Sequence, residues 1–234
     1  MNSLFNNSLF GIMLSLFAFE VGCYIYKKTK IPFFNPLFIS ITIVIVVLVG
    51  FHIDFETYNK GGEFINMFLG PATVVLAVPL YKQISLLKKH AVPILIGIFI
   101  GSTAGIISIV LLSHTLGLNE ILIKSLVPKS VTTPIGIEIS KQMQGIVPIT
   151  VAAIVISGII GAIVGHPICK LLKIKSKIAI GISLGTASHA VGTTKALEIG
   201  ETEGAMSSLA IGIAGLMTVF LAPVIYTTLT KIIG

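Results

Sequence analysis

The sequence predicts an all-α polytopic membrane protein, and three observations carry that prediction. Of the 234 residues, 54% are hydrophobic and 11% charged, against about 25% charged residues in ordinary soluble domains. The lysines gather in short clusters between apolar runs, and several runs approach the length of about 20 residues that crosses a bilayer. Two further runs are interrupted in the middle by Gly, Pro and hydroxyl residues. We therefore expect about six spanning helices plus two broken or re-entrant helical segments.

The same composition excludes several classes of function. The net charge is +7, but the lysines are not concentrated on one polar face, so we expect no nucleic-acid partner. Cys23 and Cys169 each end an apolar run and form no metal-ligand spacing. No nucleophile motif or phosphate-binding loop is present. We expect neither an enzyme nor a bound cofactor or metal.

The first two predicted helices cover residues 8–26 and 37–51. Residues 8–26 carry Glu20 and have no basic stretch before them. This pattern indicates a mature helix rather than a cleaved signal peptide. The run at 37–51 is rich in Ile and Val, but its apolar neighbours favour a membrane helix over a buried strand.

The next stretch, residues 52–63, is polar and contains Gly61 and Gly62, which predicts a loop. A third helix is expected at 66–81, kinked by two internal prolines. A fourth is expected at 91–112, where three glycines spaced by four share one face: Gly97, Gly101 and Gly105. Such a face permits close helix packing. We expect packing within the chain, with contact in a homo-oligomer or with a partner as the alternative.

The two broken regions cover residues 118–144 and 178–203. Long helices follow each of them, at 145–168 and 205–228. We treat the whole chain, 1–234, as one transmembrane domain made of three parts. These parts are the N-terminal helices 1–112, a first repeat 113–168 and a second repeat 177–230.

A shift of 60 residues superimposes the two broken regions without gaps. It aligns residues of related chemistry: Lys129 with His189, Val131 with Val191, Thr133 with Thr193, and Glu138 with Glu198. Broken segments at corresponding positions of two halves point to a transporter site. The aligned chemistry favours a true internal repeat.

The basic clusters predict the topology. Lysine-rich loops stay cytoplasmic, and here they lie at 27–30, 82–89 and 170–177. The first broken region must then begin and end on one side, as a re-entrant hairpin or two short spans. For the second we favour a hairpin, and a broken helix that crosses once is the alternative. Two hairpins would make inverted repeats whose tips meet near the midplane.

Irregular backbone at membrane depth survives only where protein or a water-filled cavity covers it. We therefore expect a small anion, such as a carboxylate, to bind between the two breaks. Its predicted ligands are Lys129, Ser130, Thr132, Thr133, Ser188, His189, Thr193, Thr194 and Lys195.

The predicted proton-coupling groups are Glu138, Glu198 and His189, because ionisable groups within a membrane are functional candidates. Each of these residues could instead have a purely structural role. Glu138 and Glu198 could form structural ion pairs with Lys141 and Lys195. Lys129 could reach toward the lipid interface, and His189 could be a hydrogen-bonded structural residue.

Both broken regions carry specific motifs. Pro128-Lys-Ser-Val-Thr-Thr-Pro134, Gly185-Thr-Ala-Ser-His-Ala-Val-Gly-Thr-Thr-Lys-Ala-Leu-Glu198 and the following Gly200-Glu-Thr-Glu-Gly-Ala-Met-Ser-Ser-Leu-Ala210 closely resemble signatures of the LrgB/CidB family. The resemblance covers essentially the whole chain. It implies a multi-pass protein of the bacterial cytoplasmic membrane that works beside a small LrgA/CidA-type partner.

The resemblance implies two functions, and both stay open at this point. The antiholin-like members are associated with control of murein hydrolases and autolysis. Other relatives resemble transporters: the plastid glycolate/glycerate translocator is similar to an LrgA-like part fused to an LrgB-like part, and bacterial pairs resemble pyruvate facilitators. We favour a facilitated or proton-coupled transporter of pyruvate, glycolate or a similar monocarboxylate. A regulatory or pore-forming membrane protein is the alternative.

Overall fold

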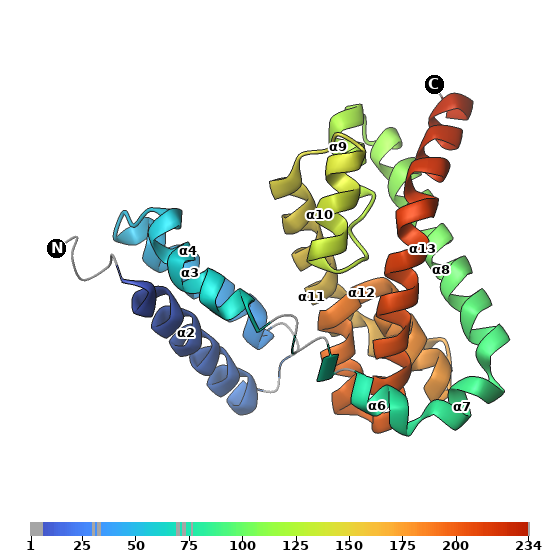
Figure 1. The fold of residues 1–234 in the computed structure, drawn as a ribbon, viewed down its shortest axis with the longest axis horizontal. Coiled ribbons are helices and arrows are strands. Elements are labelled where there is room, and N and C mark those ends of the chain that lie inside the picture. The colour runs from blue at the N-terminus through green and yellow to red at the C-terminus, as the bar shows by residue number, and fades with distance from the viewer. Residues whose placement is uncertain are drawn as a thin grey trace. The chain divides into compact units, whose positions relative to one another are not determined.

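The computed structural model describes residues 7–29, 31, 34–68, 71, 74–75 and 77–233, which fall into two compact units (Figure 1). The first unit is Met1–Val75 and the second is Leu76–Gly234. The long elements of the described residues are all α-helices, and no strand occurs among them. The predicted all-α class is confirmed. The division of the chain into repeats stays a prediction.

Among its described residues, the first unit contains the helices α2 (Ser8–Thr29), α3 (Pro36–Gly50) and α4 (Phe55–Asn66). Helix α2 packs against both of the others. Pro36 stands in the first turn of α3, where a missing N–H costs nothing. The side chain of Asn35 accepts a hydrogen bond from the Leu37 N–H at 2.9 Å and caps that helix.

The prediction of a loop at 52–63 is wrong, because α4 occupies most of that stretch. The glycines that suggested a turn serve a close helix crossing instead. A Cβ on Gly61 would lie 2.7 Å from the Cα of Gly11 and 2.6 Å from the N of Ile12, both in α2. The hydroxyls of Ser15 and Tyr58 add a hydrogen bond of 2.7 Å across the same contact. Packing in α4 thus overrides the local turn signal.

The predicted third span, 66–81, does not form one helix among the described residues. Its ends belong to α4 and to α6 (Ala77–Lys82), and residues 69, 70, 72, 73 and 76 lie outside the described part. Helix α7 (Ile84–Lys89) follows and leads into the second unit's first long helix.

Three long helices frame the second unit: α8 (Ala91–Thr115), α11 (Val147–Leu171) and α13 (Glu201–Ile233). Together with α2, these are the described helices long and apolar enough to cross a membrane. Helix α3 is apolar but has only 15 residues. The described residues therefore supply four candidate spans and one shorter apolar helix.

The first broken region forms a helical hairpin, here called the first hairpin, from α9 (Glu120–Leu126), the tip 127–132 and α10 (Thr133–Gln142). Its arms of 7 and 10 residues rise only about 10 and 15 Å. A buried core joins it to α8 and α13 and includes Ile106, Ile123, Ile139 and Tyr226. Neither arm is long enough to span a bilayer.

The second broken region, α12 (Lys177–Ile199), is interrupted at His189, where φ is 41° and ψ is −133°. A continuous helix would hold Leu184 and Gly192 about 12 Å apart. Instead, a Cβ on Gly192 would lie 3.1 Å from the Leu184 carbonyl carbon, and Ile180, Leu184 and Ala196 share one buried cluster. The chain therefore turns back at His189, and we call α12 the second hairpin.

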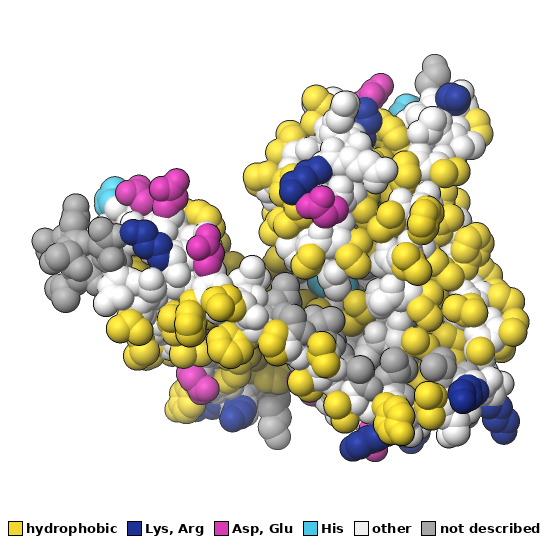
Figure 2. All heavy atoms as spheres, in the orientation of Figure 1, with side chains coloured by type: hydrophobic (Ala, Val, Ile, Leu, Met, Phe, Trp, Pro, Cys, Tyr) yellow, Lys and Arg dark blue, Asp and Glu magenta, His cyan; other side chains and the backbone are white. Residues whose placement is uncertain are grey.

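The two hairpins enter the second unit from opposite ends. The first hairpin's base is tied to the start of α11, because Ser125 Oγ accepts a hydrogen bond from the Ile146 N–H at 2.7 Å. The second hairpin starts just after α11 ends. An ion pair of 3.6 Å between Lys82 and Glu201 places the basic segment of α6 and α7 at this second end too. Figure 2 shows basic side chains gathered there, and apolar side chains along α8 and α13.

Candidate functional site

The tips of the two hairpins meet at the middle of α11. Ser157 Oγ donates a hydrogen bond of 2.7 Å to the Lys129 carbonyl in the first tip. His189 Nε2, at the second tip, lies 3.0 Å from the Ile154 carbonyl. Ser157 Oγ is also 3.0 Å from that same Ile154 carbonyl. One turn of α11 therefore links both tips, and the pair aligned by the 60-residue shift, Lys129 and His189, occupies equivalent places in the two hairpins.

Two glycines of α11 make room for the second tip. A Cβ on Gly158 would lie 2.6 Å from His189 Cε1, and a Cβ on Gly161 would lie 2.8 Å from the Cβ of Ser188. Both His189 and Ser188 are buried. The backbone of His189 is strained, since a positive φ is rare for residues other than glycine. The surrounding packing holds this strained residue in place.

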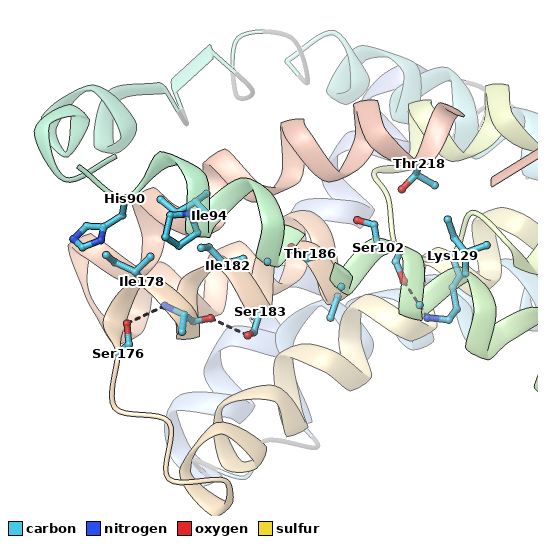
Figure 3. A pocket seen from close by; sticks show the side chains of 18 of the residues that line it. His90, Ile94, Ser102, Lys129, Ser176, Ile178, Ile182, Ser183, Thr186 and Thr218 are labelled. Carbon is cyan, nitrogen blue, oxygen red and sulfur yellow. Dashed lines mark hydrogen bonds between the residues drawn. The ribbon is translucent and has the colours of Figure 1, made fainter. Parts of the chain in front are cut away.

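A cavity of about 610 Å³ lies beside the first tip. It is enclosed by α8, the first arm of α12, the first tip and one residue of α13. Its α8 wall runs from His90, at the helix N-cap, to Ile106, a rise of about 24 Å. Figure 3 shows His90 and Ser176 at one end of this cavity and Lys129 and Thr218 at the other. Because Ser176 is exposed, the cavity reaches the surface at the basic end.

The predicted glycine face of α8 forms part of this cavity. Gly97, Gly101 and Gly105 all line it. A Cβ on Gly101 would be 3.2 Å from Thr186 Cγ2, whereas Cβ atoms on the other two would have nothing within 4 Å. Among the described residues, this face therefore packs closely only at Gly101, and its other two glycines leave room in the cavity.

Lys129 places a cation at the inner end of the cavity. Its side chain is half-buried, and its Nζ donates a hydrogen bond of 3.0 Å to Ser130 Oγ. The ion pairs among the described residues use Lys82, Lys124, Lys141 and Lys195. Lys129 thus has no carboxylate partner in the described part of the chain. A partly buried ammonium of this kind is unfavourable until an anion binds it.

The other predicted ligands do not all face this cavity. Ser130 lines it beside Lys129. Thr193 is fully buried in the second hairpin, where its hydroxyl bonds the His189 carbonyl at 3.0 Å and Ser207 Oγ at 2.7 Å. The bond to Ser207 ties the second hairpin to α13. The remaining predicted ligands are outside the cavity lining: Thr132, Thr133, Ser188, His189, Thr194 and Lys195.

The two predicted proton-carrying carboxylates are both in exposed ion pairs. Glu138 accepts a hydrogen bond of 2.8 Å from Lys141, and Glu198 accepts one of 2.8 Å from Lys195. Their side chains are 73% and 51% exposed. Both occupy hairpin arms away from the tips. This geometry is that of structural ion pairs, the alternative to a role in proton transfer.

Some residues of the site were not predicted from the sequence. Ser102, Thr186, Ser183 and Thr218 also line the cavity, and Ser157 joins the tips. Ser102 follows a glycine of the α8 face, and Thr186 lies inside the second motif. The neighbouring residues could therefore have identified both as candidate site residues. Ser157 is a single hydroxyl in an apolar helix and had no such signal.

Comparisons with a family model and with individual proteins point to the same family. The family model described as "LrgB-like family" matches residues 15–228. The protein named Antiholin-like protein LrgB of Bacillus cereus (strain B4264) is 39% identical over 215 residues, covering 92% of this chain and 94% of its own. The Bacillus subtilis (strain 168) protein named Uncharacterized protein YxaC is 39% identical over 214 residues, covering 92% and 93%. No solved structure matches the chain.

Proposed function

The chain belongs to the LrgB-like family, and from this premise we propose that it is a transporter subunit for small monocarboxylates such as pyruvate or glycolate. The observation that supports the proposal is the position of the Lys129 side chain. Its ammonium lines a cavity of about 610 Å³ and has no carboxylate partner among the described residues. A carboxylate entering the cavity would supply that partner.

The cavity suits a small anion on grounds of charge and size. Its surface end lies at the basic end of the unit, and a cleft lined by one sign of charge raises the local concentration of the opposite ion. Its volume is in the usual range of small-molecule pockets. The hydroxyls around Lys129 suit a ligand with more than one oxygen-bearing group.

The meeting of two hairpins at mid-helix supports alternating access. Each hairpin enters from one end and stops at the same turn of α11. If the hairpins are inverted repeats in the bacterial cytoplasmic membrane, movement of one against the other would expose the Lys129 site to each side in turn. We propose facilitated or proton-coupled transport together with an LrgA-like partner.

The test is uptake of labelled pyruvate by proteoliposomes, with and without an LrgA-like protein, measured beside leakage of a small dye. We expect saturable uptake, competed by glycolate, without dye leakage. Lys129→Gln should lower uptake at least 10-fold, because a charged hydrogen bond contributes about 1.5–3 kcal/mol.

Lys124→Gln is the matched control. This lysine lies in the same hairpin but pairs with Glu120 at 3.3 Å, so its removal should leave uptake intact. Equal uptake by the Lys129→Gln and wild-type proteins would contradict the site.

The alternative function is a regulator of murein hydrolases and autolysis, or a pore. The printed name of the Bacillus cereus relative, Antiholin-like protein LrgB, favours it. A pore would leak dye together with pyruvate and show no competition. A regulator would be silent in both assays even when the partner is present.

A further inference from the structure

Glu203 is the one buried carboxylate of this chain. The sequence contains nine Asp and Glu residues, and the structure leaves the other eight exposed. Glu203, in the first turn of α13, is only 5% exposed. None of the ion pairs among the described residues includes it. An ionised carboxylate is costly to bury unless a cation neutralises it, and a proton removes the cost altogether.

Both arms of the second hairpin pack against the turn of α13 that carries Glu203. In the first arm, a Cβ on Gly181 would lie 3.1 Å from the Glu203 carbonyl carbon. In the second arm, Leu197 meets the next residue of α13, since a Cβ on Gly204 would lie 3.1 Å from Leu197 Cα. The carboxyl itself lies over Gly200, where a Cβ would be 3.2 Å from Glu203 Cδ. A change of charge at this carboxyl therefore acts directly on the packing of the hairpin.

Ionisable side chains lie near Glu203 on the adjacent elements. His166, in α11, is within electrostatic reach of Glu203. The same imidazole is within reach of Lys170, on its own helix, and of Lys195, in the second arm. Lys195 also pairs with the exposed Glu198 at 2.8 Å. Positive charge is therefore available beside the buried carboxylate when it is ionised.

The other elements packed on this part of α13 differ in character. Ile94 of α8 shares a buried apolar cluster with Met206, three residues after Glu203. Lys82 of α6 pairs at 3.6 Å with Glu201, and both side chains are exposed. Glu203 thus has apolar packing toward α8 and ionisable neighbours toward α11 and the second arm.

This group of ionisable residues is separate from the Lys129 site. His166 is nine residues beyond Ser157, which joins the tips, so the two positions are about 14 Å apart along α11. The first arm of α12 connects the two places. It lines the cavity that holds Lys129 and packs against Glu203 through Gly181.

We propose that Glu203 binds the proton that crosses the membrane with the substrate anion. The inference rests on the transport function proposed above and selects its proton-coupled form. With the proton bound, the carboxyl is neutral and stays buried between the hairpin and α13. When the proton leaves at the basic end, the carboxylate is ionised and its stability depends on the nearby cations. Glu203 takes the role that the exposed Glu138 and Glu198 do not suit.

Coupling follows because the proton and the anion act on one element. The anion binds beside the first arm of the second hairpin, and the proton binds where that arm packs on α13. Two ligands that favour the same arrangement of a shared element strengthen each other's binding. A proton and a monocarboxylate anion together carry no net charge, so their joint passage moves no charge across the membrane.

The experiment compares two kinds of pyruvate uptake in proteoliposomes that also contain an LrgA-like protein. Net uptake is driven by a pH gradient, acidic outside. Counterflow exchanges labelled external for unlabelled internal pyruvate at equal pH, and needs the anion site but no net proton movement. Glu203→Gln keeps the shape of the side chain and cannot ionise. We expect the ratio of net uptake to counterflow to fall at least about tenfold, because an ionisable group within the membrane is lost.

Glu201→Gln is the matched control, because it makes the same chemical change two residues earlier at an exposed carboxylate. It should keep the wild-type ratio. A ratio that falls equally in both variants would overturn the proposal. So would an equal loss of net uptake and counterflow in Glu203→Gln, which would assign Glu203 a structural role.

A pH-sensitive dye trapped inside the proteoliposomes follows the proton itself. An inward pyruvate gradient should acidify the interior with the wild-type protein but not with Glu203→Gln. Wild-type protein with saturable counterflow, but with net uptake that ignores the pH gradient, would overturn this inference alone. Wild-type protein with neither kind of uptake would overturn the proposed transport function as well.

Discussion

At the scale of single residues, His189 combines backbone strain with a structural hydrogen bond. Its φ of 41° lies in a region that glycine adopts without strain and other residues rarely adopt. Its Nε2 lies 3.0 Å from the Ile154 carbonyl oxygen, within hydrogen-bond distance. The imidazole thereby fixes the second tip on α11, next to the turn that holds the first. His189 lies outside the cavity lining, so in this structure it acts on the site through the position of the tips.

Two substitutions separate the strain from the bond. His189→Ala and His189→Gly both remove the imidazole, but only glycine relieves the positive φ, which costs other residues about 1–3 kcal/mol. We expect the glycine variant to be the more stable of the two by about 1 kcal/mol. Thermal unfolding of both proteins in detergent measures the difference. An alanine variant as stable as the glycine variant would show that the backbone at 189 is relaxed.

At the scale of elements, glycines decide where helices and hairpins approach each other. Gly158 faces His189 at the second tip, and Gly61 faces Gly11 across α2 and α4. In each case the contacting partner is distant in the sequence. Gly212, on α13, has nothing within 4 Å of a Cβ and serves no such contact.

Alanine at these two kinds of glycine should have opposite effects on the free energy of unfolding. Gly158→Ala places a methyl 2.6 Å from His189 Cε1 and should destabilise by about 1–3 kcal/mol through overpacking. Gly212→Ala adds a better helix former in open space and should stabilise by up to about 1 kcal/mol. Denaturant titration in detergent compares them. Equal effects at both positions would rule out the close contact between α11 and the second tip.

At the scale of the whole molecule, the distribution of apolar side chains is that of a protein solvated by lipid. Large exposed hydrophobic residues mark the long helices of the second unit, among them Phe99, Ile160 and Phe220. The buried sites near the hairpin tips hold hydroxyls and a histidine. The basic segments of α6, α7 and the α11–α12 connection share one end, and the positive-inside rule predicts that this end faces the cytoplasm.

Labelling from outside the cell tests this orientation. In a variant without Cys23 and Cys169, Glu120→Cys should react with a membrane-impermeant maleimide on intact bacteria. Lys173→Cys should react only after permeabilisation, because it lies in the basic connection. If both positions react on intact cells, the two ends of the second unit do not lie on opposite sides of the membrane.

The sequence alone determined the helical class, both breaks and the distribution of charge, because each depends on residues close together in the chain. Clusters of Gly, Pro and hydroxyl residues interrupt a helix, and they located the two breaks within residues 118–144 and 178–203. Only the tertiary structure decided the packing role of Gly61 and the difference between Thr186 and Thr193. A hydroxyl is free or occupied according to the neighbour that folding brings to it. Ser207 takes that place for Thr193, while the buried Thr186 hydroxyl has no hydrogen-bond partner among the described residues.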